Sequence, residues 1–349
     1  MPTLNFASPK VRQFAIDIAL HWLDPNGDGK LSEGVDGFRC DVAVGPPPDF
    51  WVQLRQAVKA KNPDAILLGE LWTSAKAISA HMQGDEFDAA FDFPAYKTLE
   101  ASQDQNNDGL LAGNGSGAIA AFDLKVSAKL YASGTYMVRF LGNHDTNRVM
   151  SEVNGDMARA RAGAVWLATV PDVPMIYYGE EIGMKGSKGN GSPYWDEYRR
   201  EPLDWYAAES GPGMTTWFKP VDRYNKANDE ISVEEENAKP DSLLALYRLL
   251  GRLRRESPAL QIGDYDLPKL DGEAKDLYFL RRWDERSLFL VLINFSRTPA
   301  VWTADPAFWT AGGDTFRPLP LPIADELATV EAGQVALQPG GYAIFKATS

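Results

Sequence analysis

The stretch VDGFRCDVAV at residues 35–44 decides the fold, because it is a short apolar run that carries charged side chains to its end. Arg39 and Asp41 stand two residues apart, so on a β-strand their side chains share one face. A second apolar run, AILL at residues 65–68, leads to Glu70. The spacing of 29 residues between Asp41 and Glu70 suits one strand–helix unit. We therefore expect the two carboxylates to follow adjacent parallel strands.

The same pattern recurs further along the chain. Apolar runs at 136–141 and 173–178 lead to GNHD and GEE, so each also delivers polar side chains at its end. Segments with apolar residues three and four apart predict helices at 9–22, 49–61, 158–168 and 242–256. Alternating strands and helices predict a parallel α/β sheet or barrel, and a barrel builds its active site at the carboxyl ends of its strands. For polar residues at any single strand end, helix capping is the alternative explanation.

The texture of the sequence changes near residue 258. Beyond it only strand patterns occur, punctuated by Pro and Gly, at 276–283, 287–295, 300–303, 330–338 and 341–346. These patterns predict an antiparallel β-sandwich. The acidic, polar segment 225–240 is expected to be a loop. We therefore expect two domains, an α/β domain at 1–258 and a β-sandwich domain at 259–349.

Composition argues against several classes of function. The 349 residues include 35 Lys and Arg against 48 Asp and Glu, which gives a net charge of −13. Nucleic acids and anionic membrane surfaces attract cationic proteins, so neither is an expected partner. No apolar run reaches 18 residues and Cys40 is the only cysteine, so we expect neither a membrane-spanning helix nor an internal disulfide. Residues 1–10 lack the features of a signal peptide, and cytoplasmic and secreted locations both stay open.

Three acids at the ends of apolar runs stand out, namely Asp41, Glu70 and Asp145. Two carboxylates at adjacent strand ends can flank one glycosidic bond, where one acts as nucleophile and the other as general acid and base. The nucleophile must stay ionised while the acid keeps its proton. Glycoside hydrolysis is a reaction that needs such a pair of carboxylates. A structural ion pair is the alternative explanation for Asp41 with Arg39.

Five segments of the chain stand out together, namely VDGFRCD at 35–41, LLGELW at 67–72, FLGNHD at 140–145, VPMIYYGEEIG at 173–183, and PDSLL with YR within 240–248. In order and spacing they resemble motifs of the α-amylase superfamily of glycoside hydrolases. The first four resemble the motifs at barrel strands 4, 5, 7 and 8, and the fifth resembles the start of the last barrel helix. The resemblance extends over nearly the whole chain. It implies a (β/α)8 barrel followed by an all-β sandwich, and a retaining hydrolase of α-1,4-linked glucans such as starch and maltooligosaccharides.

The resemblance also implies catalytic roles. Asp41 is expected to be the nucleophile of a double displacement, forming a covalent glycosyl intermediate, and Arg39 is expected to pair with its carboxylate. Glu70 is expected to protonate the leaving oxygen and then to activate water. Asp145 is expected to stabilise the oxocarbenium-like transition state, and His144 to bind the sugar in the same subsite.

Other residues of these segments are candidates for binding the substrate. Asn143 belongs to the same motif as Asp145, and Trp72 follows Glu70 by two residues, so both are expected to contact the glucan. Further tryptophans that could stack on sugar rings are Trp195 and Trp217, with core packing as the alternative for each. The pair Glu180 and Glu181 is expected either to line the site or to cap a helix.

The resemblance leaves part of the family barrel unaccounted for. A weak strand at 87–93 corresponds to strand 6, and residues 9–22 correspond to the helix before strand 4, so strands 1 to 3 have no counterpart. Open strand edges aggregate unless they are paired or covered, so we expect this chain to need a preceding segment or self-association. Three alternatives therefore remain beside α-1,4 hydrolysis: an α-1,6-glucosidase, a glucan transferase, or a catalytically silent fragment.

The segment DPNGDG at 24–29 places oxygen-bearing side chains at alternate positions and a glycine at the turn, a pattern that suits calcium. Asp24, Asn26 and Asp28 are the expected ligands, with the backbone carbonyl of Lys30. Similar loops bind calcium in α-amylase relatives. Val35 stands where an EF-hand has its bidentate Glu, so a plain polar turn is the alternative. A second match at 104–109 is expected to be a turn, and no organic cofactor is expected.

Overall fold

The computed structural model describes residues 4–100, 109–189, 196–217, 223–304, 315–321, 327–331 and 333–348. The chain forms two compact units. Unit 1 consists of Met1–Pro94 and Lys125–Val138, and unit 2 consists of Ala95–Leu124 and Arg139–Ser349. Among the residues described, no helix combines the length and apolar character needed to cross a bilayer.

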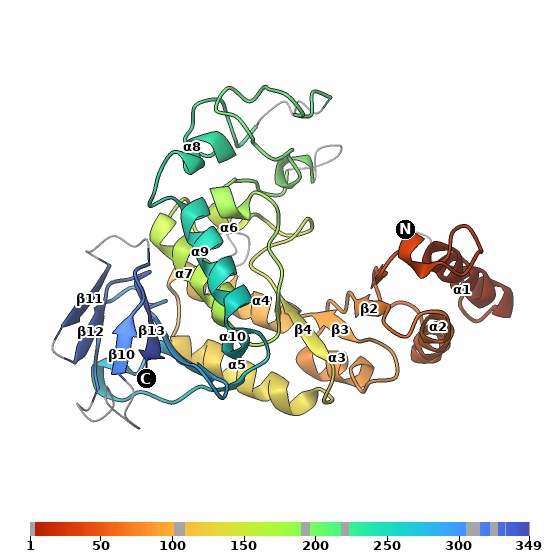
Figure 1. The fold of residues 1–349 in the computed structure, drawn as a ribbon, viewed down its shortest axis with the longest axis horizontal. Coiled ribbons are helices and arrows are strands. Elements are labelled where there is room, and N and C mark those ends of the chain that lie inside the picture. Colours follow the sequence, from red (N-terminus) through yellow and green to blue (C-terminus); the bar gives the residue numbers. More distant parts are fainter. Residues whose placement is uncertain are drawn as a thin grey trace. The chain divides into compact units, whose positions relative to one another are not determined.

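The first part of the chain alternates helices and strands, as the sequence predicts. In order, these elements are α1 (Pro9–Leu23), β1 (Gly37–Cys40), α2 (Pro48–Lys61), β2 (Ile66–Gly69), α3 (Ala75–His81), β3 (Ala89–Phe91), α4 (Phe93–Leu99), α5 (Gly117–Leu130) and β4 (Tyr136–Arg139) (Figure 1). The boundaries between the units fall within α4, α5 and β4.

The strands of this region form one parallel sheet with the order β1-β2-β3-β4-β5, where β5 is Val173–Pro174. The register pairs Cys40 with Gly69 and Gly69 with Ala90, so the carboxyl ends of β1, β2 and β3 are aligned. The predicted adjacency of the strands before Asp41 and Glu70 is therefore confirmed. β1 lies at one edge of the described sheet.

Helices α1 and α2 pack against each other in unit 1 (Figure 1). Each begins with a proline, which suits the first turn because an N–H there has no partner within the helix. The apolar face of α2 presents Phe50, Leu54 and Val58 to a core that also contains Leu23 of α1 and Leu67 of β2. This core fixes the strands that precede the predicted catalytic acids.

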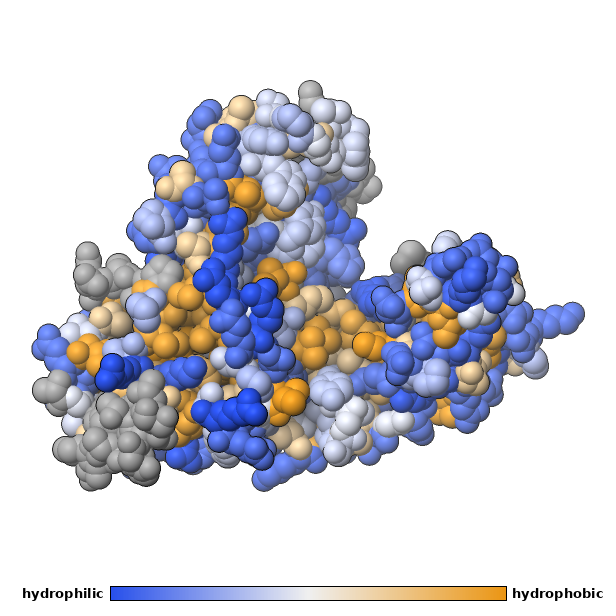
Figure 2. Space-filling model, in the orientation of Figure 1, coloured by the Kyte–Doolittle hydropathy of each residue, from blue (hydrophilic) through white to orange (hydrophobic). Residues whose placement is uncertain are grey.

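Unit 2 continues with further helices and with short 3₁₀ turns. Its helices beyond residue 139 are α6 (Val149–Glu152), α7 (Met157–Thr169), α8 (Val233–Asn237), α9 (Leu243–Glu256) and α10 (Pro258–Gln261). Ser242 accepts a hydrogen bond from the Ala245 amide and so caps α9. α9 packs against α7 through an apolar face that includes Leu246 and Leu250. Figure 2 shows hydrophilic residues along α9 on the face of the molecule that is in view.

Two antiparallel sheets follow in unit 2. Their strands are β6 (Asp264–Asp266), β7 (Tyr278–Trp283), β8 (Leu288–Ile293), β9 (Ala300–Thr303), β10 (Thr315–Pro318), β11 (Ala328–Glu331), β12 (Gln334–Leu337) and β13 (Tyr342–Thr348). One sheet has the order β10-β13-β8-β7-β6 and the other has the order β11-β12-β9. A single apolar cluster takes members from both sheets, among them Leu290, Trp302, Val335 and Phe345. The expected antiparallel sheets are therefore present.

Three local predictions need correction. The segment 225–240 is not a loop throughout, because it contains α8, whose capping box joins Ser232 and Glu235. The expected strand at 173–178 is reduced to Val173–Pro174, since proline offers no N–H to extend a ladder. The expected strand at 330–338 is divided between β11 and β12, which pair with each other. The domain boundary at residue 258 stays a prediction.

Candidate active site

Asp41 and Glu70 come together in unit 1 because the pairing of β1 and β2 continues beyond the two strands. The Glu70 amide donates to the Cys40 carbonyl at 2.9 Å, and the Ala43 amide donates to the Glu70 carbonyl at 3.0 Å. Both acids therefore follow the carboxyl ends of their strands, on the same side of the parallel sheet. The Asp41 side chain is largely exposed, at 67%, whereas the Glu70 side chain is buried, at 7%.

Arg39 joins the two carboxylates. Its Nη1 pairs with Oδ1 of Asp41, and its Nη2 lies 2.5 Å from Oε1 of Glu70. The predicted contact between Arg39 and Asp41 is thus present, whereas the sequence did not predict the contact with Glu70.

Val42 contributes through its backbone and was not predicted as part of the site. Its amide donates to Oε2 of Glu70 at 2.8 Å. Its φ of +46° lies in the left-handed region, which a β-branched residue rarely adopts. Strained backbone of this kind often accompanies functional sites. No local sequence signal marks it, because valine normally favours extended backbone.

The predicted stacking tryptophans have different surroundings. Trp72 is 45% exposed, and its ring stacks on Phe93 with 4.5 Å between centroids and 11° between planes. Trp72 is therefore held in one orientation while nearly half of it remains accessible. Trp217 is 82% exposed in unit 2. Trp195 lies outside the described residues.

The motif after β4 belongs to unit 2. Asn143 is buried, and its side-chain Oδ1 accepts a hydrogen bond from the Asp145 backbone amide at 2.8 Å. The backbone amide of Asn143 donates to Oγ1 of Thr146 at 2.8 Å. Asn143 therefore shapes the turn that presents Asp145. Nε2 of His144 lies 3.1 Å from Oδ2 of Asp145, and both side chains are partly exposed.

Two arginines that no sequence motif predicts contact this turn. Nη2 of Arg200 lies 2.8 Å from Oδ1 of Asp145, and its Nε donates to the His144 carbonyl at 2.9 Å. Arg199 donates to the Asp145 carbonyl from the short 3₁₀ turn Glu197–Arg199. These contacts join residues more than 50 positions apart, so no local pattern could have revealed them.

The predicted acids are thus distributed over both units. Asp41, Glu70, Arg39 and Trp72 belong to unit 1, and the turn with Asp145 belongs to unit 2. Within each unit the structure brings the expected neighbours into contact. The catalytic and binding roles of these residues stay predictions.

Glu180 and Glu181 open the 3₁₀ turn Glu180–Ile182, whose N-cap is Gly179. Glu180 is buried, and its Oε1 accepts the Tyr247 hydroxyl at 2.5 Å. Burial, opposed by this hydrogen bond, raises the pKa of Glu180 to about 8. Glu180 therefore lies inside unit 2, in contact with α9, rather than at a helix cap.

The predicted calcium loop does not fit a divalent cation in its present arrangement. Oδ2 of Asp24 pairs with Nζ of Lys61, and Oδ2 of Asp28 lies 2.8 Å from Nζ of Lys30. The side-chain NH₂ of Asn26 donates to Oε2 of Glu33. In the described part of the chain, no group of three or more His, Cys, Asp or Glu residues could hold a metal ion. Most of the second match, at 104–109, lies outside the described residues.

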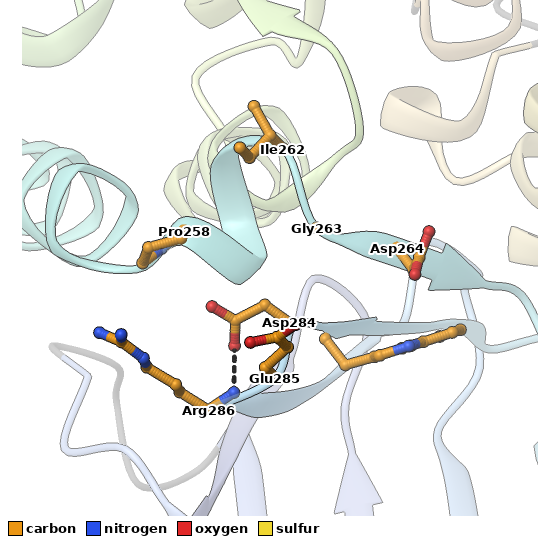
Figure 3. A pocket seen from close by; sticks show the side chains of 8 residues that line it. Pro258, Ile262, Gly263, Asp264, Asp284, Glu285 and Arg286 are labelled. Atoms are coloured by element: carbon orange, nitrogen blue, oxygen red, sulfur yellow. Dashed lines mark hydrogen bonds between the residues drawn. The ribbon is translucent and has the colours of Figure 1, made fainter.

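A surface hollow of about 750 Å³ lies elsewhere in unit 2 (Figure 3). It is lined by Pro258, Ile262, Gly263, Asp264, Trp283, Asp284, Glu285 and Arg286. In the turn at its rim, Oδ1 of Asp284 accepts the Arg286 amide at 3.0 Å. None of the predicted site residues lines this hollow.

Known proteins resemble the chain over most of its length. Residues 1–263 match the family model described as alpha amylase, catalytic domain. Alpha-amylase 3 of Dictyoglomus thermophilum is 31% identical over 305 residues, which cover 85% of this chain and 56% of that protein. A cyclomaltodextrinase of a Bacillus species is 25% identical over 299 residues, which cover 84% of this chain and 44% of that protein.

A solved structure gives the same result. The crystal structure of an α-amylase from H. orenii matches with a TM-score of 0.76 and 27% identity, covering 100% of this chain and 66% of that one. This chain spans about half the length of the curated relatives it matches. The family model and the relative at 31% identity agree with the motifs around Asp41, Glu70 and Asp145, and the chain belongs to the α-amylase family of glycoside hydrolases.

Proposed function

We propose that this protein hydrolyses α-1,4-linked glucans, such as starch and maltooligosaccharides, with retention of configuration. The observation that carries the proposal is the placement of Asp41 and Glu70 at the ends of adjacent parallel strands, with Arg39 in contact with both. A double displacement requires two carboxylates close together, and these two follow the carboxyl ends of neighbouring strands. Membership in the α-amylase family supports the choice of substrate.

Asp41 is the proposed nucleophile because its side chain is exposed and therefore accessible to an anomeric carbon. Its carboxylate contacts the Arg39 guanidinium, which fixes its position at the end of β1. In the first step the bond between the anomeric carbon and the leaving oxygen breaks as the ester to Asp41 forms. In the second step, water replaces Asp41 and regenerates the carboxylate.

Glu70 is the proposed acid and base. In the first step it gives a proton to the leaving oxygen, and in the second it takes one from water. Both of its oxygens are engaged here, by Arg39 and by the Val42 amide. Catalysis therefore requires substrate binding to turn one of these oxygens toward the glycosidic bond.

Asp145 and His144 are proposed to hold the reacting sugar, and Arg200 to hold Asp145. A carboxylate stabilises an oxocarbenium-like transition state by opposing its positive charge. Trp72 offers an apolar ring face to the glucan beside Glu70, held by its stack on Phe93.

Two other outcomes share these catalytic groups. The main alternatives are cleavage of α-1,6 linkages and transfer to a sugar hydroxyl by the same fold. The relatives include proteins named cyclomaltodextrinase and neopullulanase 2. Water and a sugar hydroxyl compete for the same glycosyl intermediate, so the acids alone do not separate hydrolysis from transfer.

We also propose that unit 1 works as part of a (β/α)8 barrel completed by further polypeptide, either a preceding segment or a second copy. Phe14, Ile18 and Trp22 lie four residues apart on α1 and are 62%, 46% and 53% exposed. Such a stripe is normally the buried side of an amphipathic helix. The edge position of β1 in the described sheet supports the same proposal.

The test is to determine the stereochemistry of maltoheptaose cleavage. Proton NMR monitors the anomeric configuration of the products during the first minutes of the reaction. We expect α-anomeric products first, with β-anomers appearing later by mutarotation. Glu70→Gln should cleave maltoheptaose far more slowly than the wild type. With an activated aryl maltoside, whose leaving group needs no proton, the variant should regain much of the rate of the first step. Initial β-anomers would refute the double displacement.

A further inference from the structure

The loop between α1 and β1 has the sequence of a calcium loop but the contacts of a loop closed by lysine. We propose that the Lys61 ammonium is a built-in cation that takes the place of a metal ion at Asp24, so that this loop holds its structure without calcium. The inference concerns stability alone and is independent of the proposed function.

The contact joins the ends of two helices. Asp24 directly follows the last residue of α1, and Lys61 is the last residue of α2. The Asp24 side chain is only 3% exposed, and its Oδ2 receives the Lys61 ammonium. A buried carboxylate needs a partner of opposite charge, and here a side chain supplies it.

The carboxylate of Asp24 also organises the loop itself. It accepts the Gly29 amide at 3.1 Å through Oδ2, which folds residues 24–29 back on themselves. The Lys61 hydrogen bond and charge, together with this amide, lower the pKa of Asp24 from its usual value. The carboxylate therefore performs the turn-forming role of a first calcium ligand with an ammonium opposite it.

The other oxygen-bearing side chains of the motif have internal partners too. Asp28 pairs with Nζ of Lys30 at 2.8 Å and accepts the Lys30 amide at 3.0 Å. The Asn26 amide NH₂ donates to Glu33. Glu33 also lies 3.8 Å from Nζ of Lys30, so three acids face two ammonium groups in this loop. A divalent cation would have to displace both lysines before it could bind at Asp24 and Asp28.

The closed loop leads directly into the strand that carries the predicted nucleophile. The Val35 amide donates to the Trp22 carbonyl at 3.0 Å, which returns the chain to the end of α1 just before β1. At Gly34 a Cβ would lie 2.1 Å from the Leu23 carbonyl oxygen, so the backbones meet there without room for a side chain. Lys61 thus stabilises the approach to β1.

The test compares thermal unfolding of the full chain with 1 mM calcium chloride and with 1 mM EGTA. For the wild type we expect the two Tm values to agree within about 1 °C, and titration calorimetry with calcium chloride to show no saturable binding at this loop. A wild-type Tm several degrees higher in calcium, with the increase lost in Asp24→Asn, would overturn the proposal.

Variants test the role of the lysine. Lys61→Met should lower Tm by at least about 3 °C in EGTA, because it leaves a buried carboxylate unpaired. Lys61→Arg should restore most of this loss, since it returns a cation to the same place. Lys10→Met removes an exposed lysine of α1 and is the matched control, with an expected change below about 1 °C. Equal Tm values for Lys61→Met and Lys10→Met would overturn the proposal, as would the failure of arginine to restore stability.

Discussion

Glu180 makes the stability of unit 2 depend on pH, and Glu180→Gln should remove that dependence. The carboxyl group is buried in the turn after β5, where Tyr247 of α9 donates to it at 2.5 Å. Burial is the main cause that raises its pKa to about 8, and the neighbouring Glu181 acts in the same direction. Glutamine keeps an oxygen for the Tyr247 hydroxyl but cannot ionise, so the variant isolates the proton.

The sign follows from where the proton is held. In the unfolded chain the carboxyl group ionises near its usual pKa of 4.5, whereas in the folded chain it stays protonated up to about pH 8. Between these values the folded state binds the extra proton, so its free energy of unfolding falls as pH rises. The contribution is fully present below about pH 4.5 and is lost as pH rises toward 8. Its slope approaches about 1.4 kcal/mol per pH unit, or on the order of 2 kcal/mol between pH 5.5 and 7.

The assay is urea unfolding of wild type and Glu180→Gln at half-unit steps from pH 5.5 to 7.5. The difference between the two proteins is the quantity to plot, because other titrating groups contribute equally to both. We expect the variant to gain stability relative to the wild type as pH rises. The exposed Glu285→Gln is the matched control and should follow the wild type. Parallel curves for wild type and Glu180→Gln would refute the reasoning.

Three further predictions concern single contacts. Arg200→Gln should lower kcat on maltoheptaose by about 10- to 100-fold with little change in KM, because Asp145 loses its 2.8 Å partner, and Arg200→Lys should recover part of the loss; an unchanged kcat would contradict this. Val42→Gly should raise the free energy of unfolding by up to about 1 kcal/mol in urea titrations, since glycine adopts a φ of +46° without strain; destabilisation would count against it. Leu246→Ala should lower the same quantity by about 2–5 kcal/mol, because the side chain is fully buried on α9, and a loss below 1 kcal/mol would show that the core is loosely packed there.

Elements with strong periodicity could be predicted from sequence. The leucines of α9 recur three and four apart, and the expected helix from 242 begins, after its Ser242 cap, at Leu243. The expected strand at 300–303 coincides with β9. The sequence analysis does not predict α8, because a run of glutamates favours a solvated loop, although Ser232 and Glu235 have the spacing of a capping box.

Contacts between distant residues could not be predicted. The spacing of Asp41 and Glu70 indicated adjacent strands, and the register of β1 with β2 confirmed it. Nothing near Asp145 in sequence points to Arg200, and nothing near Asp24 points to Lys61, since both contacts depend on the tertiary fold. A motif can specify which oxygens a loop offers, but the fold decides which cation reaches them.

The central claim is that Asp41 is the nucleophile of a glucan hydrolase, and reducing-sugar release from soluble starch tests it most directly. The wild type and Asp41→Asn should be compared at equal concentration, and circular dichroism should show that both are folded. Each is assayed twice, once alone and once after addition of a polypeptide that supplies the preceding barrel strands. We expect the wild type to release reducing sugar either alone or once the added polypeptide completes the barrel. In Asp41→Asn the rate of release should be lower by at least about 1,000-fold. Comparable release by the folded variant, or none by the completed wild type, would contradict the claim.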